Sequence, residues 1–118
     1  MFEADNIRDW RGRDVIDPDG SKIGQLEAIY VSTADDLPSF ATVRVGIIGR
    51  YRLAFVPLQD ATVGPGYLRV RSLKRLVKDA PSIETDGELE ATTEPAVFEH
   101  YGLVYTPGAS GERRLARR

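Results

Sequence analysis

The sequence predicts an all-β protein, a small β-barrel followed by two short helices near the C-terminal end. Apolar and polar residues alternate with a period of two over residues 40–47, as in a strand with one buried face. Turn-forming residues separate several such segments between residues 13 and 71. Beyond Arg71 the apolar spacing becomes that of a helix. In a chain of 118 residues, closure of the sheet is the expected way to remove exposed strand edges.

The first two strands are expected to form a hairpin. The segment Asp17-Pro18-Asp19-Gly20 fits a type I turn position by position, and it separates a short strand at 14–16 from a longer one at 22–32. Gly24 is expected to mark a bulge or a sharp bend in the longer strand. One face of that strand is expected to hold Leu26, Ala28 and Tyr30, with alternation failing near the strand's end.

The third and fourth strands are expected to pair through a tight turn at Gly49-Arg50. Alternation over residues 40–47 places Ala41, Val43, Val45 and Ile47 toward a core. The segment 51–58 is apolar on both faces, which is typical of a strand that is covered on both sides. One face would fill the barrel, and the other needs either the C-terminal helix or a second copy of the chain, which would give a homodimer.

The remaining elements are short. Strands are expected at 61–63 and 67–71, around a Gly64-Pro65-Gly66 turn, with Leu68 and Val70 pointing inward. Ser72 is expected to cap a first helix that ends before Pro81. Thr93 would cap a second helix that ends at Gly102, a residue suited to a left-handed C-terminal cap.

These elements suggest three parts along the chain. Residues 1–80 form the barrel with a short helix at its end, and residues 81–106 form a loop and a helix that packs on the barrel. Residues 107–118 are rich in Gly, Ser and Arg and are expected to be a disordered basic tail.

Composition excludes several classes of function. The chain has no cysteine and one histidine, which excludes thiolate chemistry and multi-histidine metal sites. The net charge of -2 gives no overall basic field, so nucleic acid is not the expected partner. No apolar run reaches the roughly 18 residues of a membrane span, and the acidic N-terminus does not resemble a signal peptide. We therefore expect a cytoplasmic protein.

Candidate catalytic, metal and cofactor residues were sought and none is predicted. If Gly20 is aligned with the invariant glycine of a calcium loop, Val15 and Leu26 fall at ligand positions and offer no side-chain oxygen. His100 has no neighbouring residue that could orient it for proton transfer. The glycine-rich segments match no phosphate-binding loop. Because nucleophile–base pairs and cofactor loops are missing, we expect no enzymatic activity.

Residues suited to an interaction surface are easier to find. Arg50, Tyr51 and Arg52 lie at a predicted hairpin tip, where they could stack on a base or hold a phosphate, or serve only to keep the strand edges from aggregating. Trp10 could plug one end of the barrel or anchor a partner. The same choice applies to three aromatic residues of the C-terminal stretch, Phe98, Tyr101 and Tyr105.

The segment from Arg13 to Val31 resembles the opening of PRC-barrel domains, with a short strand, an Asp/Gly turn, an Ile-Gly pair and a long strand. The strands at 40–45 and 53–58 and the helix at 73–78 also look like that family. The C-terminal piece at 94–103 looks like an extension of stand-alone actinobacterial members. The family includes the cytoplasmic domain of the photosynthetic reaction centre H subunit and the C-terminal domain of a ribosome maturation protein. The chain lacks the membrane helix of the former and the N-terminal domain of the latter, so neither specific role is expected.

In both of those proteins the domain is a docking module, so the resemblance implies a non-enzymatic protein-interaction or assembly module without a cofactor. Such a module would self-associate or dock a cytoplasmic protein partner. One alternative is RNA or ribosome binding by an arginine-rich surface that includes Arg50, Arg52, Arg69, Arg71 and the tail. A further alternative is a small-ligand sensor that uses the barrel interior.

Overall fold

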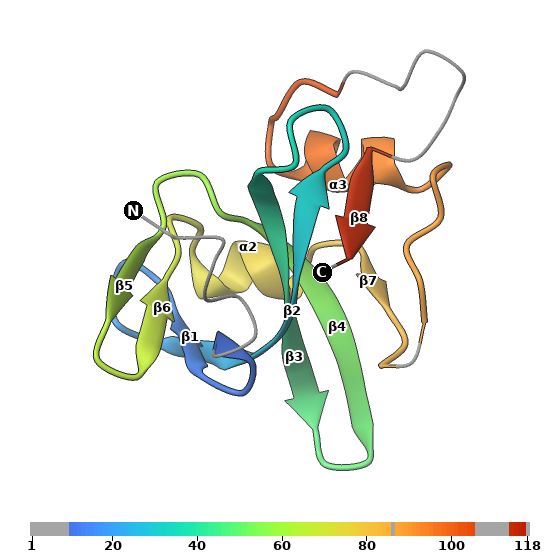
Figure 1. Ribbon diagram of the computed structural model, residues 1–118. Coiled ribbons are helices and arrows are strands. Elements are labelled where there is room, and N and C mark those ends of the chain that lie inside the picture. Colours follow the sequence, from blue (N-terminus) through green and yellow to red (C-terminus); the bar gives the residue numbers. More distant parts are fainter. Residues whose placement is uncertain (1–9, 86, 106–113, 118) are drawn as a thin grey trace.

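The computed structural model describes residues 10–85, 87–105 and 114–117. These residues form one strand-rich sheet with two short helices against it (Figure 1). The protein is therefore mostly β rather than all-β. The strands are β1 (Asp14–Ile16), β2 (Lys22–Ser32), β3 (Pro38–Ile47), β4 (Arg50–Pro57), β5 (Thr62–Gly64), β6 (Tyr67–Arg69), β7 (Ser82–Ile83) and β8 (Leu115–Arg117), and the helices are α2 (Lys74–Lys78) and α3 (Glu94–His100).

Among the described residues, hydrogen bonds do not close the sheet into a ring. Its strand order is β5-β6-β1-β2-β3-β4-β7, with β8 paired to β2 outside this path. The expectation of a closed barrel is thus wrong in its hydrogen bonding. The two edge strands, β5 and β7, have three and two residues, which gives them few backbone groups with which to close a ring. Such short edges also limit unwanted pairing with other chains.

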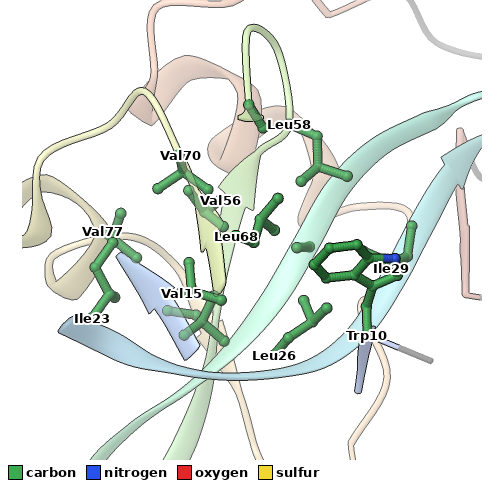
Figure 2. Packing of buried hydrophobic residues seen from close by; sticks show 14 of the residues in the cluster. Trp10, Val15, Ile23, Leu26, Ile29, Val56, Leu58, Leu68, Val70 and Val77 are labelled. Atoms are coloured by element: carbon green, nitrogen blue, oxygen red, sulfur yellow. The ribbon is translucent and has the colours of Figure 1, made fainter. Parts of the chain in front are cut away.

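The inside of the curved sheet is filled by a first apolar cluster (Figure 2). Residues from β1, β2, β3, β4 and β6 meet there, and Val77 of α2 is fully buried among them. The inward directions predicted for Leu68 and Val70 are confirmed, since both belong to this cluster. Trp10 packs at its edge with 9% of its surface exposed.

A β-bulge in β2 lets this one strand serve two cores. Leu26 pairs with Val43, but Ala28 pairs with Thr42, so β2 carries one extra residue, Glu27, at this point. The extra residue reverses the alternation that follows it. Leu26 lies in the first cluster, whereas Ala28 and Tyr30 lie in another one. The prediction that these three residues share a face is wrong for this reason.

The second apolar cluster covers the other face of β2, β3 and β4. It contains Tyr30, Phe40 and Phe55 from the sheet, and Leu89, Val97 and Leu115 from the C-terminal third of the chain. Tyr30 and Phe55 contact each other edge to face, with ring centroids 5.0 Å apart. The apolar strand β4 therefore obtains its second cover from the chain's own C-terminal residues, α3 among them.

The prediction of a disordered tail is wrong for residues 114–117. They form β8, which pairs antiparallel with Tyr30–Ser32 of β2. Two contacts that the sequence did not predict hold this strand. Leu115 is almost fully buried, and the carboxylate of Glu94 accepts the backbone N–H groups of Arg114 and Leu115. Residues 107–113 and 118 of the predicted tail lie outside the described residues.

Asp17 joins the first hairpin to α2. Its Oδ1 accepts the N–H groups of Asp19 and Ser21 at 2.9 Å each, which closes the predicted turn. Its Oδ2 accepts the N–H of Lys74, the first residue of α2, at 3.1 Å. The predicted cap Ser72 does not occupy this position: the N-cap is Leu73, and its side chain makes no capping hydrogen bond. A distant carboxylate thus satisfies the helix start that a local cap would normally satisfy.

Candidate docking surface at the β3–β4 hairpin

Four of the seven predicted interaction residues are used within the fold. Trp10 is buried, and the guanidinium of Arg13 lies 4.1 Å from its ring centroid. Phe98 packs edge to face between Phe40 and Tyr105, at 5.1 and 5.0 Å between centroids. The hydroxyl of Tyr101 donates to the backbone oxygen of Phe55. These aromatic groups hold α3 and the following residues on the sheet.

The buried hydroxyls of the C-terminal segment are held in their neutral form. Burial raises the pKa of Tyr101 above its usual range. Burial, together with the hydrogen bond to Glu94 at 2.7 Å, raises the pKa of Tyr105 to about 12. Both effects favour the protonated phenol, which is the form that donates to Phe55 or Glu94. The arrangement is that of a structural contact.

The other three predicted residues, Arg50, Tyr51 and Arg52, lie together at the start of β4. The β3–β4 hairpin extends away from the rest of the sheet at its turn (Figure 1). The register pairs Ile47 with Arg50, so only Ile48 and Gly49 form the turn, and Gly49 has a φ of +85° that suits glycine. Three apolar side chains are exposed here: Ile47 at 69%, Ile48 at 89% and Tyr51 at 38%.

The hairpin tip, which we define as residues 44–52, is basic as well as apolar. It contains Arg44, Arg50 and Arg52 and no acidic residue. Arg44 contacts Glu27 at 3.3 Å, and its guanidinium carbon lies 5.5 Å from the ring centroid of Tyr51. Glu27 is shared, because its other oxygen contacts Arg11 at 2.9 Å. The hairpin tip therefore keeps a net positive charge, because Glu27 is shared and the tip itself contains no acidic residue.

Arg52 is fixed against α2. Its Nη2 donates to the backbone oxygen of Lys78 at 2.7 Å, which satisfies a carbonyl at the end of the helix. Its Nη1 is buried and meets no acceptor within the described residues. Arg50, in contrast, is exposed at the turn. The two arginines flank Tyr51 on the strand, one anchored and one open to solvent.

The outer edge of β4 is only partly used. β7 pairs with Leu53 and Ala54 and goes no further. Residues 50–52 pair with β3 on one side, and on the other side no strand of the described residues pairs with them. Backbone groups of an antiparallel strand point alternately to its two sides, so those of this stretch that point away from β3 face an edge with no partner strand among the described residues.

A second surface feature is a shallow groove of about 520 Å³ beside α2. It is lined by Leu73, Lys74, Arg75 and Lys78 and by the acidic residues Asp17, Asp19 and Asp79. Three basic and three acidic residues line it together, so its charges largely balance. The pKa of Asp17 is lowered: burial opposes ionisation, but the hydrogen bonds from the N–H groups of Lys74, Ser21 and Asp19 outweigh it.

The described arginines considered for RNA binding lie at separate places in the fold. Arg71 contacts Asp60, which follows the end of β4, whereas Arg50 and Arg52 lie at the start of that strand. Arg69 faces the turn at Pro18, to whose carbonyl it donates at 3.5 Å. Arg69 and Arg71 are therefore each engaged with residues outside the start of β4. His100 contacts the backbone oxygen of Leu76 at 2.7 Å through Nε2, so it bridges α3 and α2.

Within the parts of the chain that the structure describes, no three His, Cys, Asp or Glu residues are grouped so as to hold a metal ion. No helix in those parts has the length and apolar character needed to cross a membrane.

Sequence reasoning found Arg50, Tyr51 and Arg52 but missed Arg44, Asp17 and Glu94. Arg44 was missed because the alternation over residues 40–47 places it on the strand face opposite Val43 and Val45, and the sequence does not show what lies against that face. The contact of Asp17 with Lys74 and those of Glu94 with Arg114 and Leu115 join residues far apart in sequence, so no local pattern indicates them. The contacts of these buried carboxylates with distant backbone N–H groups are visible only in three dimensions.

The curved, mostly β sheet with a projecting hairpin and two packed helices defines a small β module. A family model described as the PRC-barrel domain matches residues 2–77, and the chain belongs to that family. The search of curated proteins found no match to the chain.

Proposed function

We propose that this PRC-barrel protein is a non-enzymatic interaction module of the cytoplasm that docks a protein partner or a second copy of itself through the hairpin tip. One observation carries the proposal: apolar Ile47, Ile48 and Tyr51 are exposed beside uncompensated arginines on a projecting hairpin. Interface centres are enriched in such aromatic and arginine side chains.

The other ionisable groups support a non-catalytic role. The buried acids Asp17 and Glu94 are occupied by backbone N–H groups, and His100 contacts a backbone carbonyl. A general base or nucleophile needs a group that is accessible to substrate within hydrogen-bond reach. Each of these three side chains instead holds two elements of the fold together, which supports a structural role for them.

Site-directed photocrosslinking tests the proposal. A photoreactive amino acid at position 48 would label a partner in a native lysate or, with purified protein, a second copy. Position 63 is the control, because Val63 is also apolar and exposed but lies on β5. We expect a discrete adduct from position 48 and none from position 63. Equal labelling from both positions, or none from either, would contradict a docking role for the hairpin.

A further inference from the structure

We propose that the hairpin tip binds an extended acidic segment of a partner protein, which adds as a strand along the open edge of β4 at Arg50–Arg52. This inference rests on the proposed docking function and names the chemistry of the partner. The strand β7 pairs with β4 at Ala54 and Leu53 only, so the segment of β4 between Leu53 and the turn has no strand of the described residues on this side. An added strand would continue the line of β7 and bond to backbone groups that the fold leaves open.

The side chains of β4 define what the added strand carries on each face. Arg52 lies opposite Val45 and Arg50 opposite Ile47, so both arginines project on the face of the first cluster. Tyr51 projects on the other face, beside Arg44. Neighbouring side chains of an added strand meet these groups directly across the pair. We infer a segment that alternates acidic residues, toward Arg50 and Arg52, with apolar residues, toward Tyr51.

Charge favours such a partner over a second copy of this chain. Antiparallel pairing of two β4 edges centred on Tyr51 would place Arg50 of each copy opposite Arg52 of the other. Like charges directly opposite each other destabilise a strand pair. The tip contains three arginines and no acidic residue, and Glu27, the one described acid that contacts it, is shared between Arg44 and Arg11. An acidic strand meets complementary charge at the same positions.

A peptide titration tests the inference with the full chain. The probe is a fluorescent seven-residue peptide that alternates glutamate and valine. Its controls are the matching lysine–valine peptide and a glutamate–valine peptide with N-methylated backbone amides. Binding is followed by fluorescence polarisation, and its location by amide NMR shifts of the labelled protein. We expect binding of the glutamate–valine peptide alone, with the largest shifts at residues 50–52.

Two protein variants sharpen the result. Arg50→Glu reverses one exposed charge at the edge, and Arg75→Glu makes the same change on the exposed surface of α2. We expect Arg50→Glu to weaken binding about fivefold or more, as an exposed attraction becomes a repulsion, and Arg75→Glu to leave it within about twofold. A circular dichroism melt verifies that both variants fold.

Several outcomes would overturn the inference. They are equal binding of the lysine peptide, equal binding of the N-methylated peptide, or shifts that fall outside the hairpin. Shifts at 50–52 that depend on protein concentration without peptide would assign the edge to a second copy, and tighter binding of a single-stranded RNA at the same residues would assign it to nucleic acid. If the peptides fail while position 48 still gives a crosslink, strand addition is wrong and the docking function stands. If both fail, the docking function is wrong as well.

Discussion

Two buried carboxylates, Asp17 and Glu94, tie together parts of the chain that are far apart in sequence. Asp17 links the β1–β2 turn to the start of α2, and Glu94 links the start of α3 to β8. Each receives backbone N–H groups that would otherwise be unsatisfied at the start of a helix or strand. Charge-assisted hydrogen bonds of this kind are stronger than those between neutral groups. Both residues therefore act on the positions of whole elements.

The stability contributed by Asp17 is expected to depend on pH. Because its folded-state pKa is lowered from 3.8, the ionised form stabilises the fold above about pH 4, and this contribution is lost as pH falls through the folded value. Asp17→Asn should lower the urea midpoint at pH 7, and its difference from wild type should shrink below pH 4. Asp19→Asn, at an exposed carboxylate in the same turn, is the control. A difference that stays constant with pH would contradict the assignment.

Tyr105 is expected to titrate late. Its pKa of about 12 lies above the usual 10, so the neutral phenol stabilises the fold below pH 10 and that contribution is lost as pH rises toward 12. The absorbance at 295 nm of wild type minus that of Tyr105→Phe isolates this one group among five tyrosines. We expect a midpoint near 12, and a midpoint near 10 would show that the contact with Glu94 is not maintained in solution.

At the scale of elements, the sequence predicted the strands well because their signals are local. The turn at Asp17–Gly20 and the alternation at 40–47 depend on neighbouring residues alone, and β1 and β2 begin and end where predicted. The bulge at Glu27 and the capping of α2 by Asp17 could not be predicted, since each depends on a partner 15 or more residues away. The strand β8 was missed because its three residues have no stable conformation without β2 and Glu94.

Removal of the Glu94 carboxylate is expected to release β8. Glu94→Ala leaves the N–H groups of Arg114 and Leu115 without their acceptor in a buried place, which should cost roughly 2–3 kcal/mol. Urea unfolding measures the loss, and faster trypsin cleavage at Arg114 reports the release of the strand itself. Glu90→Ala, at an exposed acid four residues earlier, should change neither quantity. Loss of stability without faster cleavage would contradict the link to β8.

At the scale of the whole molecule, the two apolar clusters cover both faces of the central strands with residues of the same chain. The apolar character of β4 on both faces predicted that two covers were needed, but the sequence left open what the second one was. Four of the seven predicted interaction residues proved to be packing groups, namely Trp10, Phe98, Tyr101 and Tyr105. The sequence alone cannot distinguish an aromatic residue of the core from one of an interface, because the distinction depends on neighbours that only the folded structure shows.

Deletion of residues 114–118 is expected to uncover the second cluster. The deletion removes Leu115, which is almost fully buried, and exposes Tyr30 and Phe40 beneath it. Loss of a buried leucine side chain typically costs about 2–5 kcal/mol. We expect a lower urea midpoint and increased binding of the dye ANS, which marks exposed apolar surface. Arg117→Ala is the control, because this side chain is exposed at the end of β8. A truncated chain with unchanged stability would show that β8 does not cover the cluster.

The bulge of β2 has a thermodynamic consequence. The same strand supplies Leu26 and Ile29 to one core and Ala28 and Tyr30 to the other, so neither core can melt while the other keeps its share of β2. Heating should therefore give a single endotherm in scanning calorimetry, with the van't Hoff enthalpy equal to the measured one. One extra residue in β2 is thus expected to make the two packed layers unfold as one cooperative unit.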